Sequence, residues 1–138
     1  MAGGLARPDT WCQVSVPTLW DIERQTIVSN ESSEIIRMFN SEFTALAEPT
    51  PNYYPEDLKD KIDAMNERVL TGINNGVNGC GRSTTQAAYE EFYDLLFATL
   101  DELDELLGKQ RYLCGARQTE ADWRAYPNLI RFDSVYYI

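Results

Sequence analysis

The chain has 138 residues, of which 43% are hydrophobic and 25% are charged, a composition typical of a globular protein with enough apolar side chains for a core. Its formal net charge of −10 argues against nucleic acid or an acidic membrane as a partner, because phosphate binding needs a cationic surface. The sequence contains no histidine, so neither a Ser-His-Asp nor a Cys-His mechanism can be built from this chain alone.

The cysteines Cys12, Cys80 and Cys114 are far apart in the sequence. No pair has Cys-x-x-Cys spacing, so the pattern predicts neither a zinc site nor a dithiol motif, and we expect no metal. Free thiols are typical of a reducing compartment, which predicts a cytoplasmic protein. No run approaches the roughly 20 apolar residues that span a bilayer, and the N-terminus lacks the apolar core of a secretory signal, so we expect no membrane partner.

The first elements predicted are two strands and a helix. Residues 14–21 (VSVPTLWD) predict a short strand interrupted by Pro17, and residues 26–30 (TIVSN) predict its partner across a polar turn. The following segment predicts a helix that ends near Phe43, with acidic side chains in its first turn and three candidate caps, Asn30, Ser32 and Ser33. Two strands and one helix rarely bury enough surface to fold alone, so this segment predicts part of a domain.

Prolines 49, 51 and 55 stiffen the segment that follows and prevent a helix there. We therefore expect residues 1–44 to form one partial domain, residues 45–55 a linker, and residues 56–138 a second, helical domain. Residues 56–73 predict a helix, with apolar side chains at helical spacing at positions 58, 62, 65, 69 and 73.

Residues 74–83 (NNGVNGCGRS) contain three glycines and a cysteine between two helical patterns. A phosphate-binding loop would need a preceding strand and usually a lysine, and this stretch has neither. The glycines instead predict that the first helix ends here, with Ser83 or Thr84 as the cap of the next.

Residues 84–107 predict a second long helix, with one apolar face and one solvated acidic face. After a connection, Thr119 and Asp122 predict a capping box that opens a third helix. That helix contains Pro127, which we expect to kink it, and the aromatic residues Trp123 and Phe132, which we expect in the core.

Three stretches together resemble one family: VSVPTLWD from Val14, NESSEIIRMFNSEF from Asn30, and TEADWRAYPNLIRFDSVY from Thr119. The family is the glutathionyl-hydroquinone reductases, also called the Xi class of glutathione transferases, and the resemblance runs from about Val14 to Tyr136. It implies an α+β fold in which the C-terminal half of a thioredoxin-like domain (β-β-α) precedes the all-α domain of a glutathione transferase.

The resemblance also implies a glutathione site at Val16, Pro17, Glu31 and Ser32. In such folds the residue before a cis-proline presents its backbone to glutathione, as we expect of Val16. The Glu31 carboxylate would pair with the ammonium group of the γ-glutamyl end, and Ser32 with the helix N-terminus would bind its carboxylate. The spacing alone leaves open that Glu31 and Ser32 only cap a helix.

This sequence departs from the family at the catalytic position. The family's nucleophile is a cysteine in a Cys-Pro-Trp-Ala-His-Arg motif that would lie upstream of Met1, and none of the three cysteines here inherits that role. The aromatic C-terminal segment of the family would lie beyond Ile138. Asn78 aligns with a tyrosine of the family's inter-helix loop, and Asn78 and Tyr136 are candidates for the substrate cleft.

We therefore expect a fragment that is inactive alone, from a parent that uses glutathione as co-substrate to reduce glutathionyl-hydroquinones to hydroquinones, with oxidised glutathione as the second product. The implied partners are glutathione, a quinone-type or hydroquinone-type small molecule, and a second copy of the chain. Three alternatives remain open: a transferase that conjugates electrophiles, a non-catalytic transferase-like interaction module, and an acidic helical scaffold.

Overall fold

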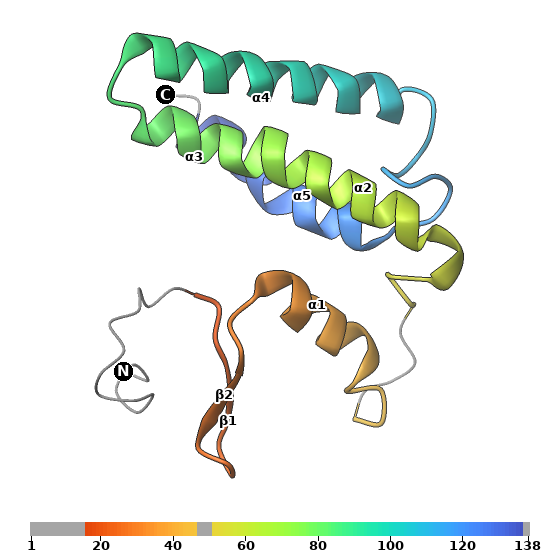
Figure 1. The fold of residues 1–138 in the computed structure, drawn as a ribbon. Coiled ribbons are helices and arrows are strands. Elements are labelled where there is room, and N and C mark those ends of the chain that lie inside the picture. The colour runs from red at the N-terminus through yellow and green to blue at the C-terminus, as the bar shows by residue number, and fades with distance from the viewer. Residues whose placement is uncertain (1–15, 47–50, 137–138) are drawn as a thin grey trace. The chain divides into compact units, whose positions relative to one another are not determined.

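The computed structural model describes residues 16–46 and 51–136, which divide into two compact units after Pro51. The first unit contains a β-hairpin and one helix, and the second contains the remaining helices (Figure 1). The division falls within the segment predicted as a linker, of which residues 47–50 lie outside the described residues.

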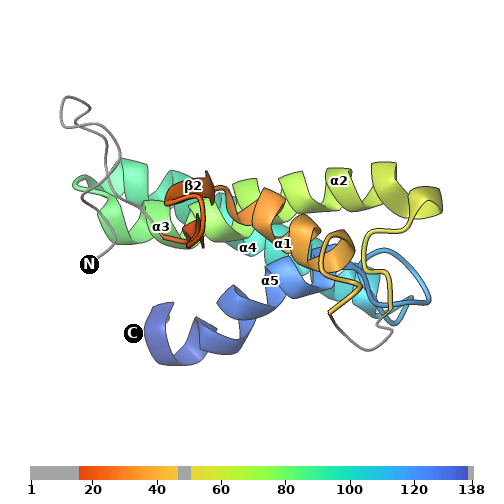
Figure 2. The ribbon, with the colours of Figure 1, turned by 90° about the horizontal axis from the view of Figure 1, so that it is seen from below.

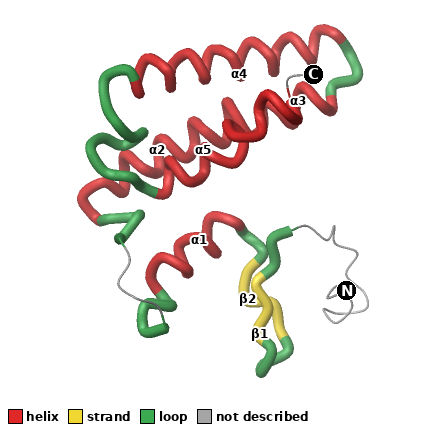
Figure 3. Tube along the Cα trace, turned by 180° about the vertical axis from the view of Figure 1, so that it is seen from behind, coloured by secondary structure: helices red, strands yellow, loops and turns green. Residues whose placement is uncertain are grey.

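The hairpin of the first unit is the predicted one. Strand β1 (Leu19–Asp21) pairs antiparallel with strand β2 (Thr26–Ser29), with Trp20 opposite Ile27 (Figure 3). The turn between them is closed by the Arg24 N–H, which donates to Asp21 Oδ1 at 2.9 Å. Strand β1 begins later than predicted, at Leu19 rather than Val14, and Val14 lies outside the described residues.

Helix α1 (Ser32–Ser41) follows the hairpin and ends two residues before the predicted Phe43. Its N-cap position is taken by Glu31, not by Asn30, Ser32 or Ser33, and the Glu31 side chain makes no capping hydrogen bond. The expected acidic first turn is confirmed at Glu34.

In the second unit, one helical path runs without a break from Glu56 to Arg82. It begins as a 3₁₀ turn, η1 (Glu56–Leu58), continues as α2 (Lys59–Val69), passes through a π turn, η2 (Leu70–Asn74), and ends as α3 (Asn75–Arg82). The predicted break over residues 74–83 is therefore wrong, because the chain stays helical to Arg82.

The glycines explain that error. Helix α4 (Gln86–Leu107) packs against α3 and η2, and a Cβ at Gly72 would lie 2.1 Å from Thr99 Oγ1 of α4. A Cβ at Gly79 would lie 2.3 Å from Phe92 Cδ1. The glycines allow two helices to approach closely, a use of the residue that competes with its common role at helix ends.

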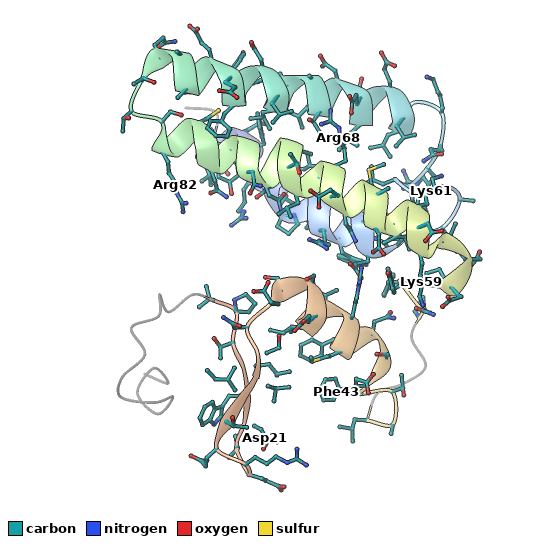
Figure 4. All side chains as sticks on the ribbon, in the orientation of Figure 1. Asp21, Phe43, Lys59, Lys61, Arg68 and Arg82 are labelled. Atoms are coloured by element: carbon teal, nitrogen blue, oxygen red, sulfur yellow. The ribbon has the colours of Figure 1, made fainter. Side chains whose placement is uncertain are left out.

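The two predicted faces of α4 are confirmed. Leu96, Thr99 and Leu103 are buried, whereas the acidic side chains at positions 90, 91, 94, 101, 102, 104 and 105 are exposed, as the oxygen-tipped sticks along the outer side of α4 show in Figure 4. The helix is capped by Thr85 rather than by Ser83 or Thr84, since its side chain accepts the Ala88 N–H at 3.3 Å.

Helix α5 (Glu120–Arg131) packs along α2 and continues as a second π turn, η3 (Phe132–Tyr136) (Figure 2). The predicted capping box is confirmed, with the Asp122 carboxylate accepting the Thr119 N–H at 2.8 Å. Pro127 lies inside the helix as expected. Trp123 does not enter the core and is 46% exposed, because Ala121 and Ala125 occupy the inward face instead.

The core of the second unit is continuous and joins α2, η2, α3, α4, α5 and the connection before α5. Its buried apolar members are Ile62, Val69, Ile73, Val77, Leu96, Leu103, Leu113, Cys114, Ala121 and Ala125. Phe132 packs against this cluster, in agreement with its predicted core position. Among the helices the structure describes, none is both long and apolar enough to cross a bilayer.

Candidate functional site

The Val16–Pro17 peptide bond is cis, as the family resemblance implies. It lies just ahead of β1, and the Val16 side chain is 93% exposed. The backbone of Val16 therefore stands at an open end of the hairpin rather than inside a packed core.

The N-terminus of α1 places Glu31 at the N-cap and Ser32 at the first helical position, both exposed. The side chain that stabilises this end of the helix is Ser29, which is only 7% exposed. The Ser29 hydroxyl accepts the Glu31 N–H at 3.1 Å and donates to Glu34 Oε2 at 2.7 Å. Ser29 and Glu34 thus bond each other, whereas Glu31 and Ser32 are both exposed.

Sequence reasoning missed Ser29, which the prediction placed inside a strand. Its position two residues before the N-cap and five before Glu34 is the only sequence signal available. The arrangement changes the interpretation of Glu31 and Ser32, since neither side chain is needed to cap the helix.

Chemically, this helix end suits a small ligand that carries both a carboxylate and an ammonium group. The first N–H groups of a helix have no intrahelical acceptor, and the helix dipole adds partial positive charge, so a carboxylate is favoured there. A carboxylate such as that of Glu31 offers an ionic hydrogen bond to an ammonium group. An α-amino acid headgroup has both functions within a few ångströms.

The two substrate-cleft candidates lie in the second unit and line different hollows. Asn78, on α3, borders an open hollow with Arg82, Thr84 and Phe92. Its amide donates to the Asn74 carbonyl oxygen at 2.8 Å. The structure thus places Asn78 on a polar surface of α3.

Tyr136 borders the other hollow, with Cys80, Tyr93 and Phe97 among its lining residues. The Tyr136 ring is half-buried, and its hydroxyl donates to Asn128 Oδ1 at 3.3 Å. Tyr136 is therefore committed to contacts within the unit, and the hollow that it borders is a different one from the hollow at Asn78.

Neither described cysteine has the character of a nucleophile. Burial raises the pKa of the half-buried Cys80 thiol, and burial likewise raises the pKa of Cys114, which is 2% exposed. A reactive thiol requires the opposite shift, toward the thiolate. Cys12 lies outside the described residues. Within residues 16–46 and 51–136, no three acidic or cysteine side chains form a metal-binding group.

A buried polar cluster between α2 and α5 was also missed by sequence reasoning. Glu120 is 1% exposed and accepts from Asn66 Nδ2 at 2.8 Å, while Arg124 lies 3.5 Å from the same carboxylate oxygen. The Glu120 N–H donates to the Tyr53 carbonyl oxygen at 2.8 Å, which ties the start of the unit to α5. A glutamate in the first turn of a helix is usually exposed, so the sequence contained no signal for its burial.

Residues 86–137 match the family model of the glutathione S-transferase C-terminal domain. Over 124 residues the chain is 49% identical to the glutathionyl-hydroquinone reductase YqjG of Escherichia coli, covering 90% of this chain and 38% of that protein.

Solved structures give the same result. The glutathione-bound structure of YqjG matches at 48% identity with a TM-score of 0.88, covering 91% of this chain and 41% of that one. The glutathione S-transferase Xi of Phanerochaete chrysosporium matches at 46% identity with a TM-score of 0.90, covering 95% and 45%. The chain thus spans about two fifths of the length of these relatives.

Proposed function

We propose that this chain, a homologue of the glutathionyl-hydroquinone reductases of the Xi class, is the middle part of such a reductase and contributes part of its glutathione site. The parent would reduce glutathionyl-hydroquinones with glutathione as co-substrate. The exposed Glu31 and Ser32 at the N-terminus of α1 carry this proposal, in a chain 48% identical to a structure with glutathione bound.

Each proposed contact uses a group that the described structure leaves accessible. The Glu31 carboxylate would pair with the ammonium of the γ-glutamyl group, and the Ser32 hydroxyl and N–H would donate to its carboxylate. The Val16 backbone, next to Pro17, would hydrogen-bond the peptide part of glutathione as an added strand. Ser29 supports the site indirectly, because it holds the start of α1 through Glu34.

The proposed reaction in the parent needs an attacking thiolate. That thiolate attacks the sulfur of a glutathionyl-hydroquinone, the carbon–sulfur bond breaks, and the hydroquinone leaves after taking up a proton. A second glutathione thiolate then attacks the mixed disulfide and releases oxidised glutathione. The raised pKa values of Cys80 and Cys114 do not suit either thiol to this role, so we propose that the chain alone is inactive.

The domain assignment belongs to the same proposal. Residues 1–44 would form part of a thioredoxin-like domain, residues 45–55 a linker, and residues 56–138 part of the helical domain. The substrate would be a quinone-type ring near the helical domain, with Asn78 and Tyr136 as candidate contacts. The parent would be a cytoplasmic homodimer.

Titration of the chain with glutathione tests the site directly. We expect the backbone amides of residues 29–34 to shift in NMR spectra, and Glu31→Gln to weaken binding roughly tenfold by removing the ionic partner of the ammonium. Glu23→Gln is the matched control, since Glu23 is an exposed residue of the hairpin turn and its substitution changes the net charge equally. Equal affinities of the two variants would contradict the assignment of Glu31.

The raised pKa values of the two described thiols also fit a non-catalytic transferase-like interaction module. Retention on immobilised glutathione separates the two proposals, because a reductase fragment with half the site would be retained and eluted by free glutathione. A folded chain that passes through unretained would favour the module.

A further inference from the structure

Two π turns of the second unit end at residues that share one neighbour. The turn η2 (Leu70–Asn74) ends at Asn74, and η3 (Phe132–Tyr136) ends at Tyr136. Asn128 of α5 contacts both, and it is only 8% exposed. π turns inside helices occur frequently at functional sites, which makes the contact between these two turns informative.

Both ends of the Asn128 amide are engaged. Its Nδ2 donates to Asn74 Oδ1 at 2.6 Å, and its Oδ1 accepts from the Tyr136 hydroxyl at 3.3 Å and from Arg131 Nη2 at 3.4 Å. Donor and acceptor therefore serve different elements: the donor binds η2, and the acceptor binds η3. A side-chain carboxamide places a donor and an acceptor on separate atoms of one neutral group.

The hydrogen bonds extend beyond the two turns. Asn74 accepts from Asn78 through its carbonyl oxygen at 2.8 Å, so Asn78 joins the same series. At the other end, the Arg131 guanidinium lies 5.9 Å from the centroid of the Tyr136 ring and donates through Nε to the Pro127 carbonyl oxygen at 2.7 Å. The two substrate-cleft candidates, which line separate hollows, are thus linked through Asn74 and Asn128.

We infer that Asn128 is a positioning residue that holds η2 and η3, and with them Asn78 and Tyr136, in one arrangement. The inference rests on the proposed function for the role of those two residues, and it adds a residue that touches neither glutathione nor the reacting atoms.

Amide hydrogen exchange on the full chain tests the inference without a ligand. Asn128→Ala removes all three side-chain bonds, and we expect exchange to become roughly tenfold faster in residues 70–74 and in residues 132–136. Asn128→Asp keeps the acceptor for Tyr136 and Arg131 but loses the donor to Asn74. We expect it to restore slow exchange in 132–136 while 70–74 remains fast.

Asn66→Ala is the matched control, because Asn66 is a buried asparagine of α2 whose side chain bonds Glu120 and neither π turn. In this variant, amide exchange in η2 and η3 should be no faster than in the rest of the second unit. Uniform acceleration by Asn128→Ala, or acceleration in only one turn, would overturn the inference. Since this readout uses no glutathione, its failure is distinct from a failure of the glutathione titration.

Discussion

The two units of the chain differ in how much core each contains by itself. Among the described residues of the first unit, Ser29 and Ile35 are buried, while Ile22 is 78% and Phe39 63% exposed. The second unit has a continuous core. A hairpin with one helix is marginal as an independent domain, so the glutathione contacts proposed at α1 lie on the unit with the smaller core of its own.

The contrast also concerns how the proposed contact residues are held in place. The helix end at Glu31 is organised locally, by the bonds of Ser29 to a backbone N–H and to Glu34. Local hydrogen bonds specify its shape, but they do not supply the burial that would stabilise it.

The largest effect should come from the core of the second unit. Ile62 is fully buried, and Ile62→Ala should lower the free energy of unfolding by about 2–5 kcal/mol, through lost apolar burial and the cavity left behind. Ile35→Ala in the first unit should cost well under half as much. Urea unfolding followed by circular dichroism measures both, and equal costs would remove the distinction between the units.

Close helix packing should give the next largest effect. Gly72→Ala forces a Cβ into Thr99 and should destabilise the second unit by about 1–3 kcal/mol. Gly81→Ala is its control, since a Cβ there meets nothing within 4 Å and should stabilise α3 by up to about 0.5 kcal/mol. Thermal unfolding of both variants checks this, and destabilisation by both would show that the space around Gly72 is not the cause.

The capping box should contribute less than the core. Asp122 accepts from the Thr119 N–H at 2.8 Å and from the Leu113 N–H at 2.9 Å, so Asp122→Ala should cost about 1–2 kcal/mol. Asp122→Asn keeps one acceptor oxygen and should recover part of the loss. Chemical unfolding measures the series, and an Asn variant as unstable as the Ala variant would argue against the hydrogen bonds as the cause.

The smallest expected effect is electrostatic. The hydrogen bond from Arg68 lowers the pKa of Glu102, with Arg68 Nε 2.7 Å from Glu102 Oε2. A lowered folded pKa contributes stability above the unfolded pKa, near 4.3 for glutamate, and that contribution is lost as the pH falls through the folded pKa. The pair is exposed, so salt should weaken it further.

The contribution of the Arg68–Glu102 pair is detected by the difference in free energy of unfolding between the wild type and Glu102→Gln, measured at pH 7 and at pH 3. The difference should be small and favour the wild type at pH 7, and it should shrink toward zero at pH 3. A difference that grows on acidification would reverse the assigned sign.

Much of this organisation was predictable from local chemistry. The hairpin, the faces of α4 and the box at Thr119 and Asp122 follow from periodicity and capping rules, which act over a few residues. Residues 74–83 were mispredicted because glycine has two uses, at helix ends and at close helix contacts. Only the position of Thr99 on another helix distinguishes them.

The candidate site, like the fold, was predictable from the sequence only in part. The place of Glu31 and Ser32 at a helix N-terminus was predictable, but the role of Ser29 was not, since its partner Glu34 becomes available only once α1 has formed. Asn128 carries no local signal at all. Its hydrogen-bond partners Asn74 and Tyr136 lie before and after it in the sequence, and tertiary packing brings both into contact with it.

The central claim is that the chain carries part of a glutathione site without the attacking thiol. The direct measurement is turnover of glutathionyl-menadiol, with glutathione present, by the wild-type chain and by a variant with Cys12, Cys80 and Cys114 all changed to serine. The account predicts that both proteins release menadiol at the uncatalysed rate. Release by the wild type above that of the serine variant would contradict it.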